Sequence, residues 1–406
     1  MMKCFKTFIV LVLLLSITGC QKQDNISIHI ISDLHYAPKD MFEYVGEFKE
    51  YCDENGTGKQ IEYQDEIFDA FINQELESKP NYIIMTGDLV YSGTYKAHNR
   101  FADKFKTLID NGIQVLVIPG NHDFDYYPFY LENNISVYSA MLKKEEFETI
   151  YNSFGYDKAL SKDDNSLSYS YKLGSSTLLI ALDTLSEYGR ADGKLKVSTL
   201  NWIEEQLEYA KKHKMNTFFI GHHNVLLHNP MFDEGYRLEN DGRLISLMNK
   251  YDAKLYISGH MHIQDINKQD SITEILNESF TLWPHRYGEL LITGSNYYYE
   301  AKSTDVSNYT NSTNDDLLNY DEYGKNFYYN NFYKQIINKR KDKNNISEEE
   351  LRFYSTEALI NGEYFAGIYD ETNYDFINNS DLSSSYIKSI VHYLDEDNLK
   401  ISGTLK

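Results

Sequence analysis

Six of the twelve histidines in this chain lie in four short motifs, and a fifth motif holds a Gly-Asp pair. Each motif comes directly after an apolar run. The five are Asp33-Leu34-His35, Gly87-Asp88, Gly120-Asn121-His122-Asp123, Gly221-His222-His223 and Gly259-His260-Met261-His262. Imidazole, carboxylate and amide groups are ligands for zinc, manganese and iron. This concentration is hard to explain by packing, and it supplies the residue types that a two-metal phosphoester-cleaving site requires.

The residue types fit the demands of phosphodiester hydrolysis. Two cations about 3.5–4 Å apart can activate water and clamp the phosphoryl oxygens, and they need a ligand that bridges them. Asp88 is our candidate, because a carboxylate has two oxygens and Gly87 permits a tight turn beside it. His122 can donate a proton to the departing oxygen. Asp123 can orient that imidazole and keep it protonated.

The motifs are positioned by alternating strands and helices between residues 26 and 300. Apolar runs predict strands at 26–32, 82–86, 113–119, 177–182, 217–220 and 254–258. Helical spacing of apolar residues predicts helices before the second, third and fifth strands. This alternation indicates an α/β core. Because the carboxyl ends of such strands share one edge, residues distant in sequence can converge there. A lone Gly-Asp or Asp-x-His is weak evidence, whereas the ordered set is strong.

This ordered set resembles the calcineurin-like metallophosphoesterase family over residues 26 to 300. The resemblance implies a four-layer α/β/β/α sandwich and two divalent or trivalent metal ions (Mn, Fe or Zn). Carried over by motif, it also implies the role of each residue. One metal would be held by Asp33, His35, Asp88 and His262, and the second by Asp88, Asn121, His222 and His260. His122 would be the general acid, and Asp123 would lie behind its imidazole. His223 would be a neighbour of the ligands that either packs beside them or contacts the substrate.

Two positions depart from the family pattern. Tyr91 stands where an aspartate is common after Gly-Asp, and Asn224 replaces the proline that usually follows His-His. Neither change removes a ligand. A closer resemblance, to bacterial lipoprotein cyclic-nucleotide phosphodiesterases with a helical C-terminal domain, rests on residues 86–93 with His98, 166–169 and 200–203. These stretches are less specific than the metal motifs.

Both ends of the chain differ from the central part. Residues 1–19 have a basic start and a short apolar run and are expected to be a lipoprotein signal peptide, with Cys20 as the lipidated residue. An ordinary cleaved signal or an N-terminal anchor is the alternative. We therefore expect an exported protein, lipid-anchored to the outer face of the bacterial cell membrane. Residues 20–304 would be the catalytic domain and residues 305–406 a small C-terminal all-α domain.

The overall charge limits the classes of partner that the protein is expected to bind. A formal net charge of −22 argues against nucleic-acid polymers and anionic membrane surfaces as main partners. Small phosphates stay possible, because bound cations reverse the local field. The leading hypothesis is a dinuclear phosphodiesterase acting on a small phosphodiester substrate, first of all a cyclic nucleotide. The alternatives are a phosphomonoesterase, a phospholipid or glycerophosphodiester hydrolase, and a catalytically silent surface lipoprotein that binds phosphorylated ligands.

Substrate choice would depend on the loops at 36–62, 126–146 and 232–243. Tyr126 could stack on a base, although aromatic loop residues more often serve as structural cover. The sequence gives no indication of the oligomeric state.

Overall fold

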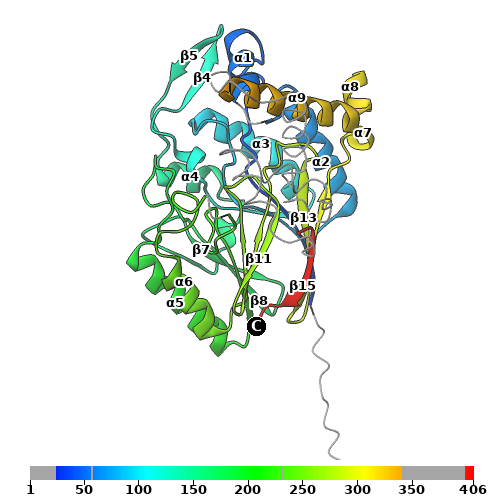
Figure 1. The fold of residues 1–406 in the computed structure, drawn as a ribbon. Coiled ribbons are helices and arrows are strands. Elements are labelled where there is room, and N and C mark those ends of the chain that lie inside the picture. Colours follow the sequence, from blue (N-terminus) through cyan, green and yellow to red (C-terminus); the bar gives the residue numbers. More distant parts are fainter. Residues whose placement is uncertain (1–23, 56–57, 230–231, 341–397) are drawn as a thin grey trace, which may run out of the picture.

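The computed structural model describes residues 24–55, 58–229, 232–340 and 398–406, and in it two large β-sheets pack face to face. Helices lie on the outer sides of the sheets (Figure 1). The layers therefore run helix, sheet, sheet, helix, and the predicted α/β/β/α sandwich is confirmed.

The first sheet contains six strands and includes the first three that the sequence predicted. They are β1 (Asn25–Ile31), β2 (Tyr82–Met85), β3 (Gln114–Val117), β13 (Arg286–Thr293), β14 (Asn296–Ser303) and β15 (Lys400–Thr404). Across the sheet their order is β15-β14-β13-β1-β2-β3. β1, β2 and β3 are parallel, and β13 pairs antiparallel with β1. The three predicted strands therefore end at one edge.

The second sheet contains seven strands and includes the other three predicted ones. They are β6 (Ser161–Lys162), β7 (Tyr169–Leu173), β8 (Thr177–Ala181), β9 (Asn216–Ile220), β10 (Leu255–Ser258), β11 (Asp265–Gln269) and β12 (Ile272–Leu276). Their order is β11-β12-β10-β9-β8-β7-β6, with β8, β9, β10 and β12 parallel. A separate hairpin is formed by β4 (Phe129–Glu132) and β5 (Ile135–Tyr138).

Apolar side chains of the second sheet alternate between two cores, because successive strand residues point to opposite faces. In β8, Leu179 and Ala181 join the core that the two sheets share, whereas Leu178 and Ile180 belong to a separate core. That separate core also contains Ile203 and other apolar side chains of the helices that cover this sheet. The continuous apolar sequence of β8 is therefore explained by burial on both faces.

Most helices connect strands and lie over the sheets, and η1 and η2 are 3₁₀ turns. They are α1 (Gly46–Asn55), α2 (Gln64–Ser78), α3 (Tyr95–Asp110), η1 (Asn121–Phe124), α4 (Lys144–Ile150), η2 (Tyr156–Lys158), α5 (Val197–Lys212) and α6 (Asp241–Tyr251). The helices predicted before the second, third and fifth predicted strands are α2, α3 and α5. Each buries the apolar face that the sequence pattern indicated.

The C-terminal part is helical only in part. Residues 305–340 contain α7 (Val306–Tyr309), α8 (Asp315–Leu318) and α9 (Tyr320–Arg340), and residues 341–397 of the predicted all-α domain lie outside the described residues. The chain then ends differently from the prediction, because β15 pairs antiparallel with β14. The edge of β14 offers unpaired backbone groups, which a returning strand satisfies. Leu405 is fully buried behind it.

Within the described residues, no helix combines the length and the apolar character needed to cross a bilayer.

Candidate metal centre

All seven predicted metal ligands lie in turns that directly follow strands. Asp33 and His35 follow β1, Asp88 follows β2, Asn121 begins η1 after β3, His222 follows β9, and His260 and His262 follow β10. The turns after β1, β2 and β3 come from one sheet and those after β9 and β10 from the other. The site therefore forms where the carboxyl ends of the two sheets meet.

A first cluster consists of Asp33, His35, Asp88 and His262, whose ligand atoms all lie within 4.8 Å of one another. The Nε2 atoms of His35 and His262 are 3.0 Å apart, and His262 Nε2 is 3.4 Å from Asp33 Oδ1. Nitrogen lone pairs and a carboxylate oxygen thus converge on one point. This donor set suits a divalent cation such as zinc, manganese or iron.

The two carboxylate oxygens of Asp33 have different environments. Oδ2 accepts hydrogen bonds from Ser32 Oγ at 2.6 Å and from the backbone N of His260 at 2.9 Å. Oδ1 is buried and, within the described part of the chain, has no hydrogen-bond partner. Burying an unsatisfied carboxylate oxygen is costly. A cation at the first cluster would satisfy it.

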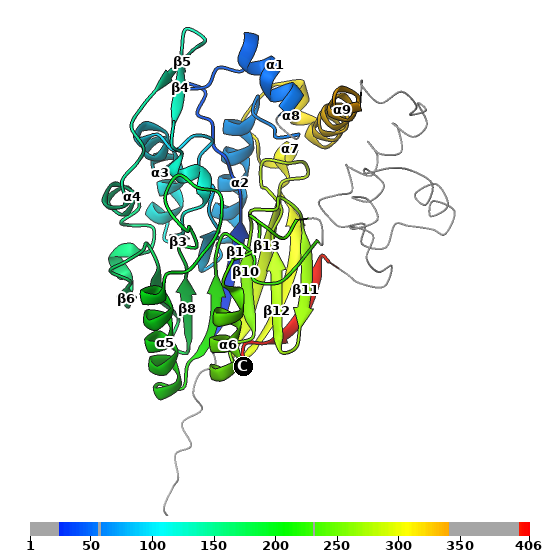
Figure 2. The ribbon, with the colours of Figure 1, turned by 60° about the vertical axis from the view of Figure 1, so that its left-hand side comes forward.

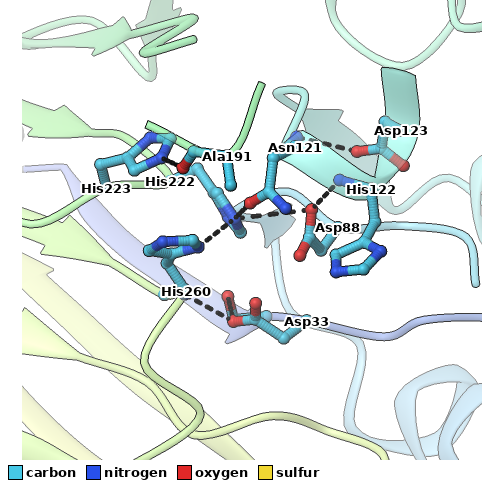
Figure 3. A network of polar contacts seen from close by, with 12 residues as sticks. Asp33, Asp88, Asn121, His122, Asp123, Ala191, His222, His223 and His260 are labelled. Atoms are coloured by element: carbon cyan, nitrogen blue, oxygen red, sulfur yellow. Dashed lines mark hydrogen bonds and ion pairs between the residues drawn. The ribbon is translucent and has the colours of Figure 1, made fainter. Parts of the chain in front are cut away.

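A second cluster consists of Asp88, His222 and His260. His222 Nε2 is 3.1 Å from His260 Nδ1, 3.2 Å from Asn121 Oδ1 and 3.5 Å from Asp88 Oδ1 (Figure 3). The other oxygen of Asp88, Oδ2, faces the first cluster at 3.8 Å from His35 Nε2. Asp88 therefore turns one oxygen toward each cluster, as a bridging ligand must.

Two of these imidazoles, those of His222 and His260, each donate a hydrogen bond from one ring nitrogen to a backbone carbonyl. This hydrogen bond determines which ring nitrogen is left to bind a cation. His222 Nδ1 donates to the carbonyl of Thr86 at 2.9 Å, which leaves Nε2 for a cation. His260 Nε2 donates to the carbonyl of Gly235 at 3.0 Å, which leaves Nδ1. Such outer partners orient metal-ligating imidazoles and set their tautomer. Neither carbonyl was predicted from the sequence.

Five of the predicted ligands occupy the left-handed region of backbone space. The φ angles are 49° at Asp33, 40° at His35, 51° at Asp88, 74° at His260 and 61° at His262. Each such residue costs about 1–3 kcal/mol and persists only where its surroundings enforce it. This concentration of strain agrees with a functional role for the edge.

Two glycines are required because other groups approach closely. A Cβ atom on Gly120 would lie 2.3 Å from both the backbone N and Oδ1 of Asp88. A Cβ on Gly259 would lie 2.5 Å from Asp33 Oδ2. The glycines in these motifs therefore keep the carboxylates in place.

The electrostatics of the site couple the binding of a cation to the protonation of the imidazoles. Burial alone would raise the pKa of the Asp88 carboxyl, but the imidazoles of His222 and His122 hold that pKa well below its usual range. Burial, with His222 beside it, lowers the pKa of His260 to about 4, so this imidazole is neutral. Burial would also lower the pKa of His222, but Asp88 raises it to about 9. A cation entering the second cluster must therefore displace a proton from His222.

The structure corrects the predicted partner of His122. Asp123 is fully buried and accepts backbone hydrogen bonds from Leu89 N, Val90 N and Gly120 N at 2.9, 3.2 and 2.8 Å, so it holds the turns rather than the imidazole. Figure 3 shows its carboxylate pointing away from the His122 ring. Asp125 faces His122 instead, with Oδ1 3.8 Å from Nδ1.

The two predicted substrate contacts differ in accessibility. His223 is fully buried, and its Nδ1 and Nε2 are each 2.8 Å from an oxygen of Thr184 and Ala191 respectively, so the ring has no free nitrogen for a substrate. Of the two alternatives given for His223, the buried ring therefore agrees with packing and not with substrate contact. Tyr126 is 57% exposed, and its ring lies against Gly189.

Two further contributors carried no recognisable sequence signal. Burial and the charge of Lys59 lower the pKa of both His35 and His262, so this lysine lies near the first cluster. Glu274 on β12 accepts hydrogen bonds from Val225 N at 3.0 Å and Leu226 N at 2.6 Å. It thereby anchors the loop that follows His222.

Comparison with known proteins agrees with this geometry. Residues 26–264 match the family model described as calcineurin-like phosphoesterase. A protein of Arcobacter nitrofigilis named "Probable glycerophosphodiester phosphodiesterase" is 28% identical over 196 residues, which are 46% of this chain and 58% of that protein. The match thus spans little more than half of that relative's length.

A solved structure supports the fold alone. A dimetal phosphatase from Danio rerio superimposes with a TM-score of 0.53 at 15% identity, covering 69% of this chain and 96% of that one. The family model, by contrast, covers more than half of the chain and includes all five motifs. The chain therefore belongs to the calcineurin-like phosphoesterase family.

Proposed function

We propose that this phosphoesterase is a two-metal phosphodiesterase of small soluble phosphodiesters, with cyclic nucleotides as the first candidate substrates. The observation that carries the proposal is Asp88, whose two oxygens face two separate ligand clusters. The backbone N of His122 donates to Asp88 Oδ1 at 2.8 Å, while its side chain is 45% exposed. A proton donor at the rim of such a site suits the expulsion of an alkoxide.

The proposed mechanism divides the work between cations and side chains. Two bound cations (Mn, Fe or Zn) would supply a water nucleophile and neutralise charge on the phosphoryl oxygens. Asp33, Asp88 and the neutral imidazoles would hold those cations. His122 would protonate the leaving oxygen, and the nearby Asp125 would stabilise the charged imidazole. The carbonyl of Thr86 would keep the His222 ring in its ligating orientation.

Aromatic side chains support a nucleotide substrate. The ring of Tyr236 lies 5.3 Å from the ring of His260, between centroids. Tyr126 and Tyr127 are exposed on the turn that follows η1. Exposed aromatic faces near a phosphate site can stack on a base. A glycerophosphodiester is the second candidate, because the Arcobacter nitrofigilis relative is named for that activity.

We also propose that the protein is exported and lipid-anchored through Cys20 at the outer face of the bacterial membrane. The proposal rests on the sequence of residues 1–20, which lie outside the described part. Metabolic labelling with a fatty acid tests it. The wild-type chain should take up label and Cys20→Ser should not, and equal labelling of both would refute the anchor.

A substrate panel tests the activity. The manganese- or zinc-loaded chain is assayed on 2′,3′- and 3′,5′-cyclic nucleotides, a glycerophosphodiester, bis-(p-nitrophenyl) phosphate and p-nitrophenyl phosphate. We expect kcat/KM to be highest for a cyclic nucleotide. A preference for the glycerophosphodiester would select the second candidate, and a preference for the monoester would contradict phosphodiesterase activity.

One variant separates an enzyme from a catalytically silent binding protein. His122→Ala should keep both metals and slow turnover by about 10²–10⁴-fold, as loss of a general acid typically does. Unchanged turnover would remove His122 from the mechanism. No turnover of any panel member by the metal-loaded wild type would favour the silent binder.

A further inference from the structure

Glu274 is a charged residue on a face of β12 that packs against apolar side chains. β12 lies between β10 and β11 in the second sheet (Figure 2). Ile272, two residues away on the same strand, points to the same side and belongs to the separate core of this sheet. The side chain of Glu274 is fully buried beside it. A buried charge is costly unless hydrogen bonds and an opposite charge compensate it, so the partners of this carboxylate show what it does.

One oxygen of Glu274 holds the loop that follows β9 and His222. Oε2 accepts hydrogen bonds from Val225 N at 3.0 Å and from Leu226 N at 2.6 Å. The buried imidazole of His228, farther along the same loop, has its Nε2 atom 3.3 Å from the same oxygen. Two backbone N–H groups and an imidazole thus compensate the carboxylate and hold this loop against β12.

The other oxygen of Glu274 binds the start of the turn that carries His260. Oε1 accepts a hydrogen bond from Ser258 Oγ at 2.6 Å, and Ser258 is the last residue of β10. Within the described part of the chain, the side-chain hydrogen bonds of Glu274 all go to Ser258 or to residues of the loop after His222. Glu274 therefore connects the two turns that supply both imidazoles of the second cluster.

Asn224 strengthens the same connection and accounts for the departure from the usual His-His-Pro pattern. Its side-chain amide donates to Ser258 Oγ at 2.9 Å. Its backbone N donates to the carbonyl of Tyr236 at 3.2 Å, one residue after the Gly235 carbonyl that accepts a hydrogen bond from His260 Nε2. A proline could supply neither the side-chain amide nor the backbone N–H group. An asparagine at this position thus links the turn after β9 to both sides of the His260 imidazole.

We propose that Glu274 is the positioning residue of the second cation site, because it holds the turns of His222 and His260 at the separation that a shared cation requires. His222 Nε2 and His260 Nδ1 lie 3.1 Å apart in this arrangement. The first cluster should depend on Glu274 much less, since three of its four ligands follow β1 and β2 of the other sheet. This role rests on the proposed two-metal centre and adds a residue that controls the affinity of one of its two sites.

Manganese binding to the full chain tests the role without a substrate. The metal-free chain is titrated with manganese, the affinity of each ion is measured, and electron paramagnetic resonance distinguishes a coupled pair of ions from a single ion. The test variant is Glu274→Gln, which removes the charge and keeps the size of the side chain. The control is Glu75→Gln, which also removes a fully buried carboxylate that faces a histidine, with Oε2 2.5 Å from His29 Nδ1. The side-chain partners of Glu75, His29 and Ser78, lie in β1 and α2 and not in a turn that carries ligands.

A milder pair of variants keeps the test decisive if the loss of a buried charge prevents folding. Ser258→Ala removes the hydroxyl that joins Glu274 to the His260 turn. Its control, Ser170→Ala, removes a fully buried hydroxyl of β7 that donates to Gln206 Oε1 at 2.9 Å. Thermal unfolding of the metal-free variants shows which of them are folded.

We expect wild type and both controls to bind two ions as a coupled pair. Glu274→Gln should bind the second ion about 10–100-fold more weakly, as is typical when a group that orients metal ligands is lost, and the first ion with unchanged affinity. Ser258→Ala should weaken the second ion in the same direction by a smaller factor.

Two kinds of failure can be told apart. Unchanged affinity for the second ion in a folded Glu274→Gln chain, or equal weakening of both ions, would overturn the role of Glu274 and leave the two-metal centre intact. If Glu274→Gln does not fold, unchanged affinity in Ser258→Ala would overturn the role instead. Fewer than two ions in the wild type would contradict the two-metal centre itself, and the role of Glu274 with it.

Discussion

Asp125 is the carboxylate that faces His122, and its replacement by asparagine tests how the proposed acid is held. Asp125 Oδ1 lies 3.8 Å from His122 Nδ1. At that separation and an effective dielectric constant of about 20, two unit charges attract by about 4 kcal/mol. The His122 side chain is 45% exposed, and solvent screening therefore reduces the attraction between the two side chains to about 1–2 kcal/mol. This range corresponds to a loss of about 5- to 30-fold in kcat for Asp125→Asn.

The assay compares two leaving groups. An alkoxide needs a proton as it departs, whereas p-nitrophenolate is a stable anion and needs none. Asp125→Asn should therefore slow a cyclic nucleotide or glycerophosphodiester much more than bis-(p-nitrophenyl) phosphate, with KM and metal content unchanged. Asp123→Asn is the matched control, and it should instead lower thermal stability and metal content, because Asp123 holds three backbone N–H groups. Equal slowing of both leaving groups by Asp125→Asn, or an unchanged kcat, would refute the reasoning.

Three further perturbations probe the frame of the site. Gly120→Ala places a Cβ 2.3 Å from Asp88 Oδ1, so metal analysis should find fewer than two cations per chain; two retained cations would contradict the close-approach argument. Burial would lower the pKa of His228, but Glu274 raises it to about 10. This pKa is higher than that of a histidine in the unfolded chain, which is near 6.5. The protonated His228 therefore contributes its full stabilisation to the folded chain below about pH 6.5, and this stabilisation disappears as the pH rises to about 10. The unfolding free energy in urea should thus fall more steeply over that range in wild type than in His228→Gln, and parallel curves would exclude the effect. Leu405→Ala empties a fully buried position behind β15 and should cost about 2–5 kcal/mol of unfolding free energy, whereas a cost below 1 kcal/mol would show that β15 is not part of the stable core.

The sequence predicts the strands and helices that have a clear apolar period. β8 and β9 are buried on both faces and appear as short apolar runs, while α3 and α5 show helical spacing. Convergence of the motifs follows from the parallel strands, whose carboxyl ends share an edge. The division of those strands between two sheets could not be derived from periodicity, and it came from the family resemblance alone. β15, with the sequence KISGT, lacks an apolar alternation and is defined only by the edge of β14.

Side-chain directions in the turns explain why Asp125 and not Asp123 faces His122, and why His223 packs away from the metal clusters. His122 lies in the 3₁₀ turn η1, where residues three apart eclipse one another, so Asp125 falls on its side and the adjacent Asp123 does not. His222 and His223 are consecutive after a strand and point to opposite sides, one toward Asp88 and the other toward Thr184. The gathering of these side chains at two clusters was thus predictable from motif order, whereas the hydrogen-bond partner of each side chain depended on the local backbone.

Metal stoichiometry tests the central claim most directly. The chain is loaded with manganese, freed of excess metal, and analysed for bound manganese and for bis-(p-nitrophenyl) phosphate turnover, beside Asp88→Ala. Because Asp88 turns one oxygen toward each cluster, we predict two ions per wild-type chain and at most one in the variant, with turnover lost. Two ions retained by a folded Asp88→Ala chain, or fewer than two in the active wild type, would contradict the bridged two-metal centre.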